Sequence, residues 1–211
     1  MRPAFFARSL LASLAVAGLL AASPTWAQKL MTVQSGSMEP TLHRDSHVWV
    51  NLVAMLTSDP VRGDVVVFRP PTGDGWWMSR VIGLPGDSLR YGADHRLTIN
   101  GHEVDLRASP EAPPATESFR DIALVVRVEA LPGSLHRILV PKPGPEAPVR
   151  TYRELAQEPA CRVSAPAFEC QVPPGRYFLM GDNRDNARDS RYLGFIPRES
   201  IGGRVSTGDT P

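Results

Sequence analysis

The amino-acid sequence predicts a mainly β protein behind one N-terminal membrane segment. Three observations indicate this fold class: short alternating segments between turn residues, an Asn-Gly pair within one of them, and an apolar stretch at the N-terminus. With 211 residues, of which 42% are hydrophobic, the chain is long enough to bury a core. The simplest division is an N-terminal segment, 1–28, and one β domain, 29–211.

The apolar N-terminal stretch, SLLASLAVAGLLAASPTWA over residues 9–27, follows Arg2 and Arg8. Its length is close to the roughly 20 residues that span a bilayer as a helix. Pro24 and the ending TWA also resemble a cleavage site, so a retained anchor and a removed signal peptide are both open. Because a basic flank stays in the cytoplasm, either interpretation predicts that the rest of the chain is exported.

Alternating and apolar segments predict the strands that follow. They are SHVWVNLVAM (46–55), GDVVVFRP (63–70), SRVIGLPGD (79–87), LRYGADHRLTINGHEVDL (89–106), IALVVRVEA (122–130), HRILVPK (136–142) and GRYFLMGDN (175–183). Asn100-Gly101 predicts an antiparallel hairpin with a type I′ turn, because both central residues of that turn need positive φ.

Prolines accumulate between about residue 108 and residue 174, in SPEAPPATES, VPKPGPEAPV and QVPPG. Two predicted strands lie among them, so we expect an inserted β-subdomain with irregular loops there. Outside the N-terminus, only residues 152–157 suggest a short helix.

The charge of the chain is nearly balanced, with 23 Lys and Arg against 22 Asp and Glu. This balance argues against the basic surface of a nucleic-acid-binding protein. Lys29 and Lys142 are the only lysines. Their scarcity matters because arginine stays protonated and cannot serve as a general base.

The two cysteines, Cys161 and Cys170, are expected to form a disulfide around a small surface loop, because an exported compartment permits pairing. Two isolated cysteines without a nearby histidine make a poor zinc site. The Asp- and Asn-rich run over residues 181–189 lacks the spacing of an EF-hand calcium loop. No metal site is therefore predicted.

Four segments carry the motifs that point to chemistry. They are QSGSMEPTL (34–42), RGDVVVFRPP (62–71), SRVIGLPGD (79–87) and FLMGDNRDNARDSRYLGFIP (178–197). In the first, a Pro-Thr turn after the serines is expected to present Ser37 at the end of an extended stretch. A Ser-Gly-Ser sequence alone is common in loops, so its significance comes from the three companions.

Together, behind an exported apolar segment, these segments resemble the type I signal peptidase family of membrane-bound serine proteases. The resemblance covers about residues 30–205 and is weakest in the proline-rich part. It implies a mostly antiparallel β fold, with a catalytic core and an inserted β-subdomain, on the periplasmic face of a bacterial inner membrane. It also implies exported preproteins with small residues before the cut as partners, and no cofactor or nucleic acid.

The resemblance makes Ser37 the nucleophile, and it makes the Ser35 hydroxyl and the Ser37 backbone N–H the oxyanion hole. It places a neutral lysine base immediately before Arg80, but this chain has Ser79 there. It also places a supporting serine two residues before the aspartate of DSR, where this chain has Ala187.

The resemblance also implies a set of residues that support the site. All of them are present in this chain: Gly181, Asp182, Arg184, Asp189 and Arg191. The scaffold is therefore retained in the sequence while the proton-transfer pair is not.

A serine hydroxyl needs a neighbour that accepts its proton, which raises the question of a substitute base. Lys29 is expected at the membrane edge. Lys142 lies in the proline-rich part of the chain, where the resemblance to the family is weakest. His43 and His47 are closer in sequence, and histidine is the commonest general base. Both histidines are nevertheless expected on the surface or on a strand face.

Three functions stay open on the sequence. The first is a signal peptidase I-like serine endopeptidase that removes signal peptides. The second is a catalytically impaired paralogue that binds signal-peptide-like or pilin-like segments by strand addition. The third is a specialised processing protease of a secretion or conjugation system. Ser79 and Ala187 favour the second, whereas the retained Ser37 favours a protease.

Overall fold

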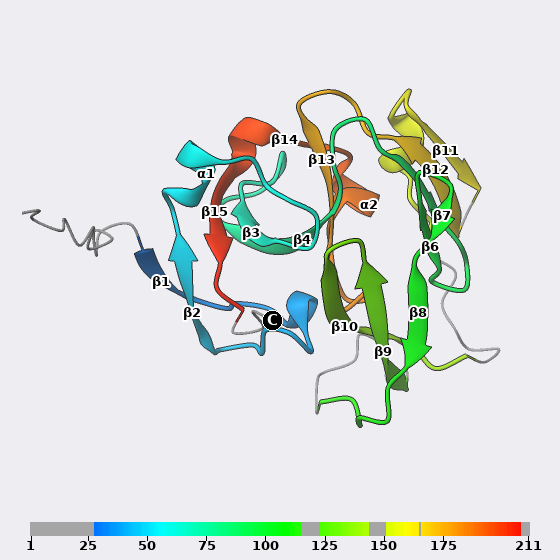
Figure 1. The fold of residues 1–211 in the computed structure, drawn as a ribbon, viewed down its shortest axis with the longest axis horizontal. Helices are drawn as coiled ribbons and strands as arrows, with labels where there is room; N and C mark the ends of the chain where they lie inside the picture. The colour runs from blue at the N-terminus through cyan, green and yellow to red at the C-terminus, as the bar shows by residue number, and fades with distance from the viewer. Residues whose placement is uncertain (1–27, 115–122, 144–150, 165, 208–211) are drawn as a thin grey trace, which may run out of the picture.

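The computed structural model describes residues 28–114, 123–143, 151–164 and 166–207, which form three antiparallel sheets (Figure 1). The predicted mainly β class is confirmed. Residues 1–27, which carry the predicted anchor or signal segment, lie outside the described residues. Within the described ranges, no helix is long and apolar enough to cross a membrane.

The largest sheet has seven strands in the order β1-β2-β15-β3-β4-β13-β14. Their bounds are β1 Gln28–Thr32, β2 His47–Asn51, β3 Val65–Phe68, β4 Trp77–Gly83, β13 Arg176–Met180, β14 Ile196–Pro197 and β15 Ile201–Val205. Along β2, exposed His47 and Trp49 alternate with buried Val48 and Val50, as expected where one sheet face covers a core. All four residues of β3 are buried, which places this strand at the centre of the sheet.

Two smaller sheets complete the β structure. The three-stranded sheet has the order β10-β9-β8, with β8 Asp105–Ala108, β9 Leu124–Leu131 and β10 Ser134–Pro141. The five-stranded sheet has the order β11-β12-β5-β6-β7, with β5 Ser88–Tyr91, β6 Leu97–Ile99, β7 His102–Glu103, β11 Cys161–Ser164 and β12 Ala167–Gln171. Cys161 lies directly opposite Cys170 on β12, and the two form a disulfide.

The hairpin predicted at Asn100-Gly101 joins β6 to β7. Ile99 lies opposite His102, and φ is 52° at Asn100 and 81° at Gly101. Both central residues thus have the positive φ of the predicted turn, which confirms the hairpin.

The helices differ from the sequence prediction. They are α1 Ala54–Thr57, α2 Ser190–Leu193 and the single 3₁₀ turns η2 Gly36–Met38, η3 Leu155–Gln157 and η4 Arg198–Ser200. The strand predicted through Met55 is wrong at its end, because Asn51 Oδ1 accepts hydrogen bonds from the N–H groups of Val53 and Ala54 and starts α1 instead. Of the helix predicted over 152–157, only its second half forms.

The segment after β13 connects the seven-stranded and three-stranded sheets. The Leu139 N–H on β10 donates to the Asp182 carbonyl, and the Arg184 N–H donates to the Leu139 carbonyl, both at 2.9 Å. The turn η2 lies in the same region, between the two sheets in Figure 1. Residues from the first, third and fourth motif segments therefore meet here.

Candidate active site

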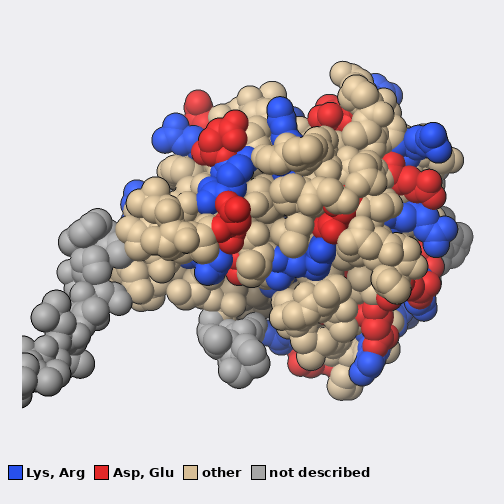
Figure 2. All heavy atoms as spheres, turned by 45° about the horizontal axis from the view of Figure 1, so that its top comes forward, with Lys and Arg blue, Asp and Glu red and all other residues tan. Residues whose placement is uncertain are grey.

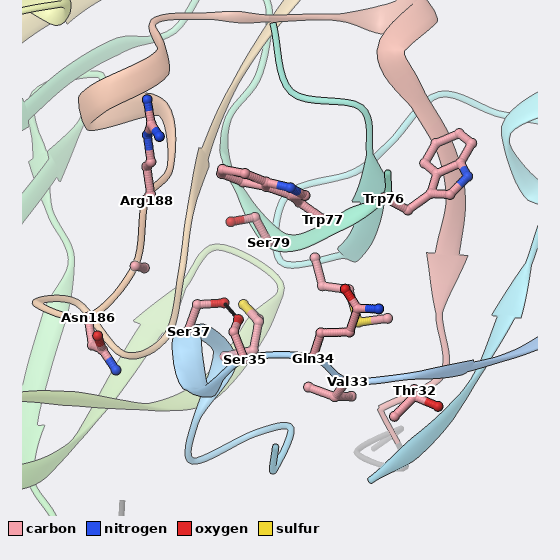
Figure 3. A pocket seen from close by; sticks show the side chains of 13 residues that line it. Thr32, Val33, Gln34, Ser35, Ser37, Trp76, Trp77, Ser79, Asn186 and Arg188 are labelled. Carbon is pink, nitrogen blue, oxygen red and sulfur yellow. Dashed lines mark hydrogen bonds between the residues drawn. The ribbon is translucent and has the colours of Figure 1, made fainter. Parts of the chain in front are cut away.

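The pocket between η2, β4 and the loop after β13 brings together the positions that the sequence marked as candidate site residues (Figure 3). It has a volume of about 430 Å³. Its lining consists of Thr32, Val33, Gln34, Ser35, Ser37, Met38, Trp76, Trp77, Met78, Ser79, Asn186, Ala187 and Arg188. Ser37, Ser79 and Ala187 thus face one cavity, although they come from three distant segments.

The turn that carries Ser37 is held from behind by Asn183. The Ser37 carbonyl accepts a hydrogen bond from the Asn183 N–H at 3.0 Å, and the Gly36 carbonyl accepts one from Asn183 Nδ2 at 3.1 Å. Asn183 is buried. Sequence reasoning did not single it out, although it lies within the GDN sequence of the fourth segment.

Gly181 allows the loop after β13 to lie close to the turn that carries Ser37. A Cβ atom at this position would lie 2.3 Å from the Ala187 Cβ and 2.6 Å from the Ser37 carbonyl oxygen. Only glycine lets the backbone pass between the two without displacement. The position of the Ser37 turn therefore depends on residue 181 having no side chain.

The Ser37 hydroxyl forms its hydrogen bond with another hydroxyl. Ser37 Oγ and Ser35 Oγ are 3.0 Å apart, and either atom can donate (Figure 3). This geometry places two hydroxyls at one end of the pocket, but neither removes a proton from the other at neutral pH.

Ser79 lies on β4 opposite Val66 and is only 3% exposed. Its hydroxyl makes no hydrogen bond within the described ranges. No lysine, histidine or carboxylate is among the described residues that line the pocket. The substitute bases considered from the sequence, Lys29, His43, His47 and Lys142, are all exposed, and none of them lines it.

Arg80, next to Ser79, is engaged with Asp182 instead of the pocket. Its Nε and Nη2 donate to the two Asp182 carboxylate oxygens at 2.8 and 2.6 Å, and the Thr41 hydroxyl donates to the same carboxylate at 2.5 Å. Burial by itself raises the pKa of Asp182, but the Arg80 guanidinium and these hydrogen bonds hold it below its ordinary value. The ion pair and its hydrogen bond from Thr41 thus join the segment after η2, β4 and the GDN loop.

Arg184 forms a second buried ion pair, with Glu129 of β9. Two guanidinium nitrogens donate to the two Glu129 oxygens, and His136 Nε2 lies 3.2 Å from one of them. Burial opposes ionisation of Glu129, yet Arg184 and His136 hold its pKa well below the ordinary range. Sequence reasoning missed Glu129, which lies in the proline-rich part of the chain, where the resemblance to the family is weakest.

Asp189 and Arg191 form a third buried pair. Arg191 Nε and Nη2 donate to Asp189 at 2.8 and 2.6 Å, and the Gly181 N–H donates to the same carboxylate at 2.8 Å. Asp189 also accepts from the Arg191 N–H and so begins α2. Like Asp182 and Arg184, these two residues hold the backbone around the pocket and do not line it.

This arrangement defines an antiparallel β protein whose candidate site is a serine on a short turn, with a second serine in hydrogen-bond contact. Comparison with known families then identifies the particular group. The chain belongs to the family described as signal peptidase, peptidase S26, whose family model matches residues 6–207. The resemblance stated from the four motifs is confirmed.

Individual relatives agree with this membership. Signal peptidase I of Pseudomonas fluorescens is 34% identical over 199 residues, which cover 82% of this chain and 61% of that protein. Signal peptidase I of Aquifex aeolicus is 29% identical, with 82% of this chain and 72% of that protein covered. Signal peptidase IB of Staphylococcus aureus is 30% identical, with 83% and 74% covered. The chain therefore matches between about three fifths and three quarters of the length of these relatives.

Proposed function

We propose that this protein is a serine endopeptidase that removes signal peptides from exported preproteins, with Ser37 as its nucleophile. The observation that carries the proposal is the Ser35–Ser37 hydroxyl pair, which faces a peptide-sized pocket on a turn held by Asn183. Membership of the signal peptidase family supports the reaction class.

Two backbone segments beside Ser37 are open to an extended peptide. β13 pairs with β4 only from Arg80 onward, so the edge of Trp77–Ser79 that faces away from β3 has no partner strand in the described chain. The backbone groups of Gln34 also form no hydrogen bonds within the described residues, whereas Ser35 is the N-cap residue at which the 3₁₀ turn η2 begins. A preprotein segment that enters as an added strand would form backbone hydrogen bonds with both segments.

The bond-forming step follows from this placement. Ser37 Oγ attacks the scissile carbonyl carbon, and the Ser35 hydroxyl and the Ser37 N–H donate to the oxyanion that forms. The Ser37 proton passes to solvent water, since none of the described pocket residues is a base. The C–N bond then breaks, the leaving amine takes a proton from water, and a second water hydrolyses the ester.

This route is slower than one with a positioned base. A general base contributes about 10²–10⁴ in rate, whereas binding and an oxyanion hole alone retain roughly 10³–10⁴ over water in serine sites. The proposed enzyme is therefore a slow protease. In this function Ser79 occupies the base position without acting as a base.

Membrane attachment belongs to the same proposal. Residues 1–28 would attach the chain to the bacterial inner membrane, with the β domain on the periplasmic face where preproteins emerge. The domain division stays a prediction, including the insertion over about 108–174.

A second candidate function is peptide binding without cleavage. It is favoured by the pocket lining, in which the described chain places no lysine, histidine or carboxylate beside Ser37. The open strand edges serve a binder as well as a protease. A specialised role in secretion or conjugation stays a prediction from the sequence.

Cleavage of a model preprotein by the full chain in detergent separates the two candidates. We expect slow cleavage at the signal peptide junction by the parent and none by Ser37→Ala. Binding without cleavage in both proteins would establish the second candidate. Equal cleavage by the two would show that Ser37 is not the nucleophile.

A further inference from the structure

Among the described residues that line the pocket, Arg188 alone carries a formal charge. Its side chain is exposed and rises from the loop that also carries Asn186 (Figure 3). In this view it stands on the opposite side of the pocket from Trp76. A cation at the mouth of an otherwise uncharged cavity interacts electrostatically with any ligand that enters the cavity.

No acidic group of the described chain neutralises Arg188. The adjacent Asp189 is fully used by Arg191 and by the Gly181 N–H. The other arginines of this segment, Arg184 and Arg191, are buried and paired with carboxylates. On the face drawn in Figure 2, positive and negative side chains lie intermingled.

The path of the peptide brings it to Arg188. A strand added beside Gln34 and Trp77–Ser79, as proposed above, would pass Ser37, and Asn186 and Arg188 line the same pocket. A substrate residue near the scissile bond therefore comes within reach of an uncompensated guanidinium, which pairs with a carboxylate in a planar fork.

We infer that Arg188 is a specificity-determining residue that selects an Asp or Glu side chain close to the scissile bond. This inference rests on the proposed function and adds a substrate class to it. Because the guanidinium is solvent-exposed, the preference amounts to a factor of about 2–5, the size expected of an exposed ion pair.

Binding measurements in the Ser37→Ala background test the inference without cleavage. The probes are extended peptides spanning a signal peptide junction, in which one Asp or one Asn is moved through the positions on either side of the cut. Binding is followed by tryptophan fluorescence, because Trp76 and Trp77 line the pocket. At one position we expect the Asp peptide to bind about 2–5-fold more tightly than its Asn counterpart.

Substitution of Arg188 gives the discriminating result. Arg188→Gln removes the preference at that position, and Arg188→Glu turns it into a preference for a Lys peptide over the Asp peptide. The matched control is Arg162→Glu, which makes the same change in net charge at an exposed arginine of β11 outside this pocket. It leaves the preference unchanged. Raising the salt concentration from 50 mM to 500 mM weakens the preference, because exposed charges are screened.

The outcomes separate the inference from the proposed function. Equal binding of the Asp and Asn peptides at every position overturns the inference and leaves the proposed function standing. A preference that persists in Arg188→Gln also overturns it, because another group then reads the carboxylate. Failure of every peptide to bind contradicts the inference and the proposed binding mode together.

Discussion

The backbone N–H of Asn183 donates to the carbonyl of Ser37 at 3.0 Å, and this contact joins the candidate nucleophile to the loop that contributes Asn186, Ala187 and Arg188 to the same pocket. The two residues belong to segments far apart in the chain. The residues on either side of Asn183 are held in buried ion pairs, Asp182 with Arg80 and Arg184 with Glu129. The geometry of Ser37 is therefore determined by residues that do not touch a substrate.

Restoring the proton-transfer pair tests the proposed chemistry. We expect the double substitution Ser79→Lys with Ala187→Ser to raise the rate of preprotein cleavage by about 10²–10⁴, because both positions line the pocket beside Ser37. A lysine at the buried residue 79 has a lowered pKa and is partly neutral. Ser37→Ala in the double variant should abolish the gain, and a gain that survives it would contradict the assignment of Ser37.

The pH profile of cleavage distinguishes solvent from a side-chain base. Without a base in the described pocket, the parent rate should rise with hydroxide concentration, about tenfold per pH unit, over the range in which the protein is folded. The lysine-containing double variant should instead level off above the pKa of its lysine. A plateau near neutral pH in the parent would reveal a base among residues outside the described ranges or in the substrate.

Stability should fall on acidification because of Asp182 and Glu129. Their ordinary pKa values are 3.8 and 4.5, and both are lowered in the folded protein. At acidic pH the unfolded chain therefore binds more protons, so the contribution to stability is complete above these ordinary values and is lost as pH falls through the folded-state values. Urea unfolding at pH 7 and pH 3.5 measures this loss.

Substitution identifies the source of that pH dependence. Glu129→Gln should flatten the decrease in unfolding free energy, whereas Glu103→Gln, at an exposed glutamate, should leave it unchanged. A decrease of the same size in Glu129→Gln as in the parent would show that this carboxylate does not cause it.

Adding one methyl group at residue 181 should displace the Ser37 turn. The new Cβ of Gly181→Ala would lie within 2.3 Å of the Ala187 Cβ and 2.6 Å of the Ser37 carbonyl oxygen. We expect a loss of about 1–3 kcal/mol in the free energy of unfolding, together with weaker peptide binding. Ala187→Gly in the same chain removes the first clash alone and should restore only part of the loss. Full restoration would mean that the approach to Ser37 is not tight.

Removing the amide of Asn183 should loosen the same turn. Asn183→Ala loses the hydrogen bond from Nδ2 to the Gly36 carbonyl, which is worth about 1 kcal/mol. Asn183→Asp should cost more, because a carboxylate oxygen then faces that carbonyl oxygen. Thermal unfolding and peptide binding measure both effects. Equal stability of the two variants would show that the side-chain contact is not formed.

Local sequence patterns predicted the strands with strong apolar character and the Asn-Gly hairpin. They missed β1, β11, β12, β14 and β15. These strands are short, polar or rich in glycine, as in the IGGRV sequence of β15, and they form because neighbouring strands supply their hydrogen bonds. The motifs also missed Asn183 and Glu129, whose partners lie 147 and 55 residues away in the chain. Pairing over such separations leaves no periodic signal.

The sequence by itself determined which chemical groups the candidate site has: the hydroxyls of Ser35 and Ser37, and a serine and an alanine at residues 79 and 187. Side-chain chemistry is covalent and needs no coordinates. The tertiary structure decided which of these groups meet, that the lysines and the histidines His43 and His47 of the described chain stay outside the pocket, and that Arg188 stands unpaired at its mouth. Distances between remote segments exist only once the sheets have packed, and proton transfer and charge pairing depend on those distances.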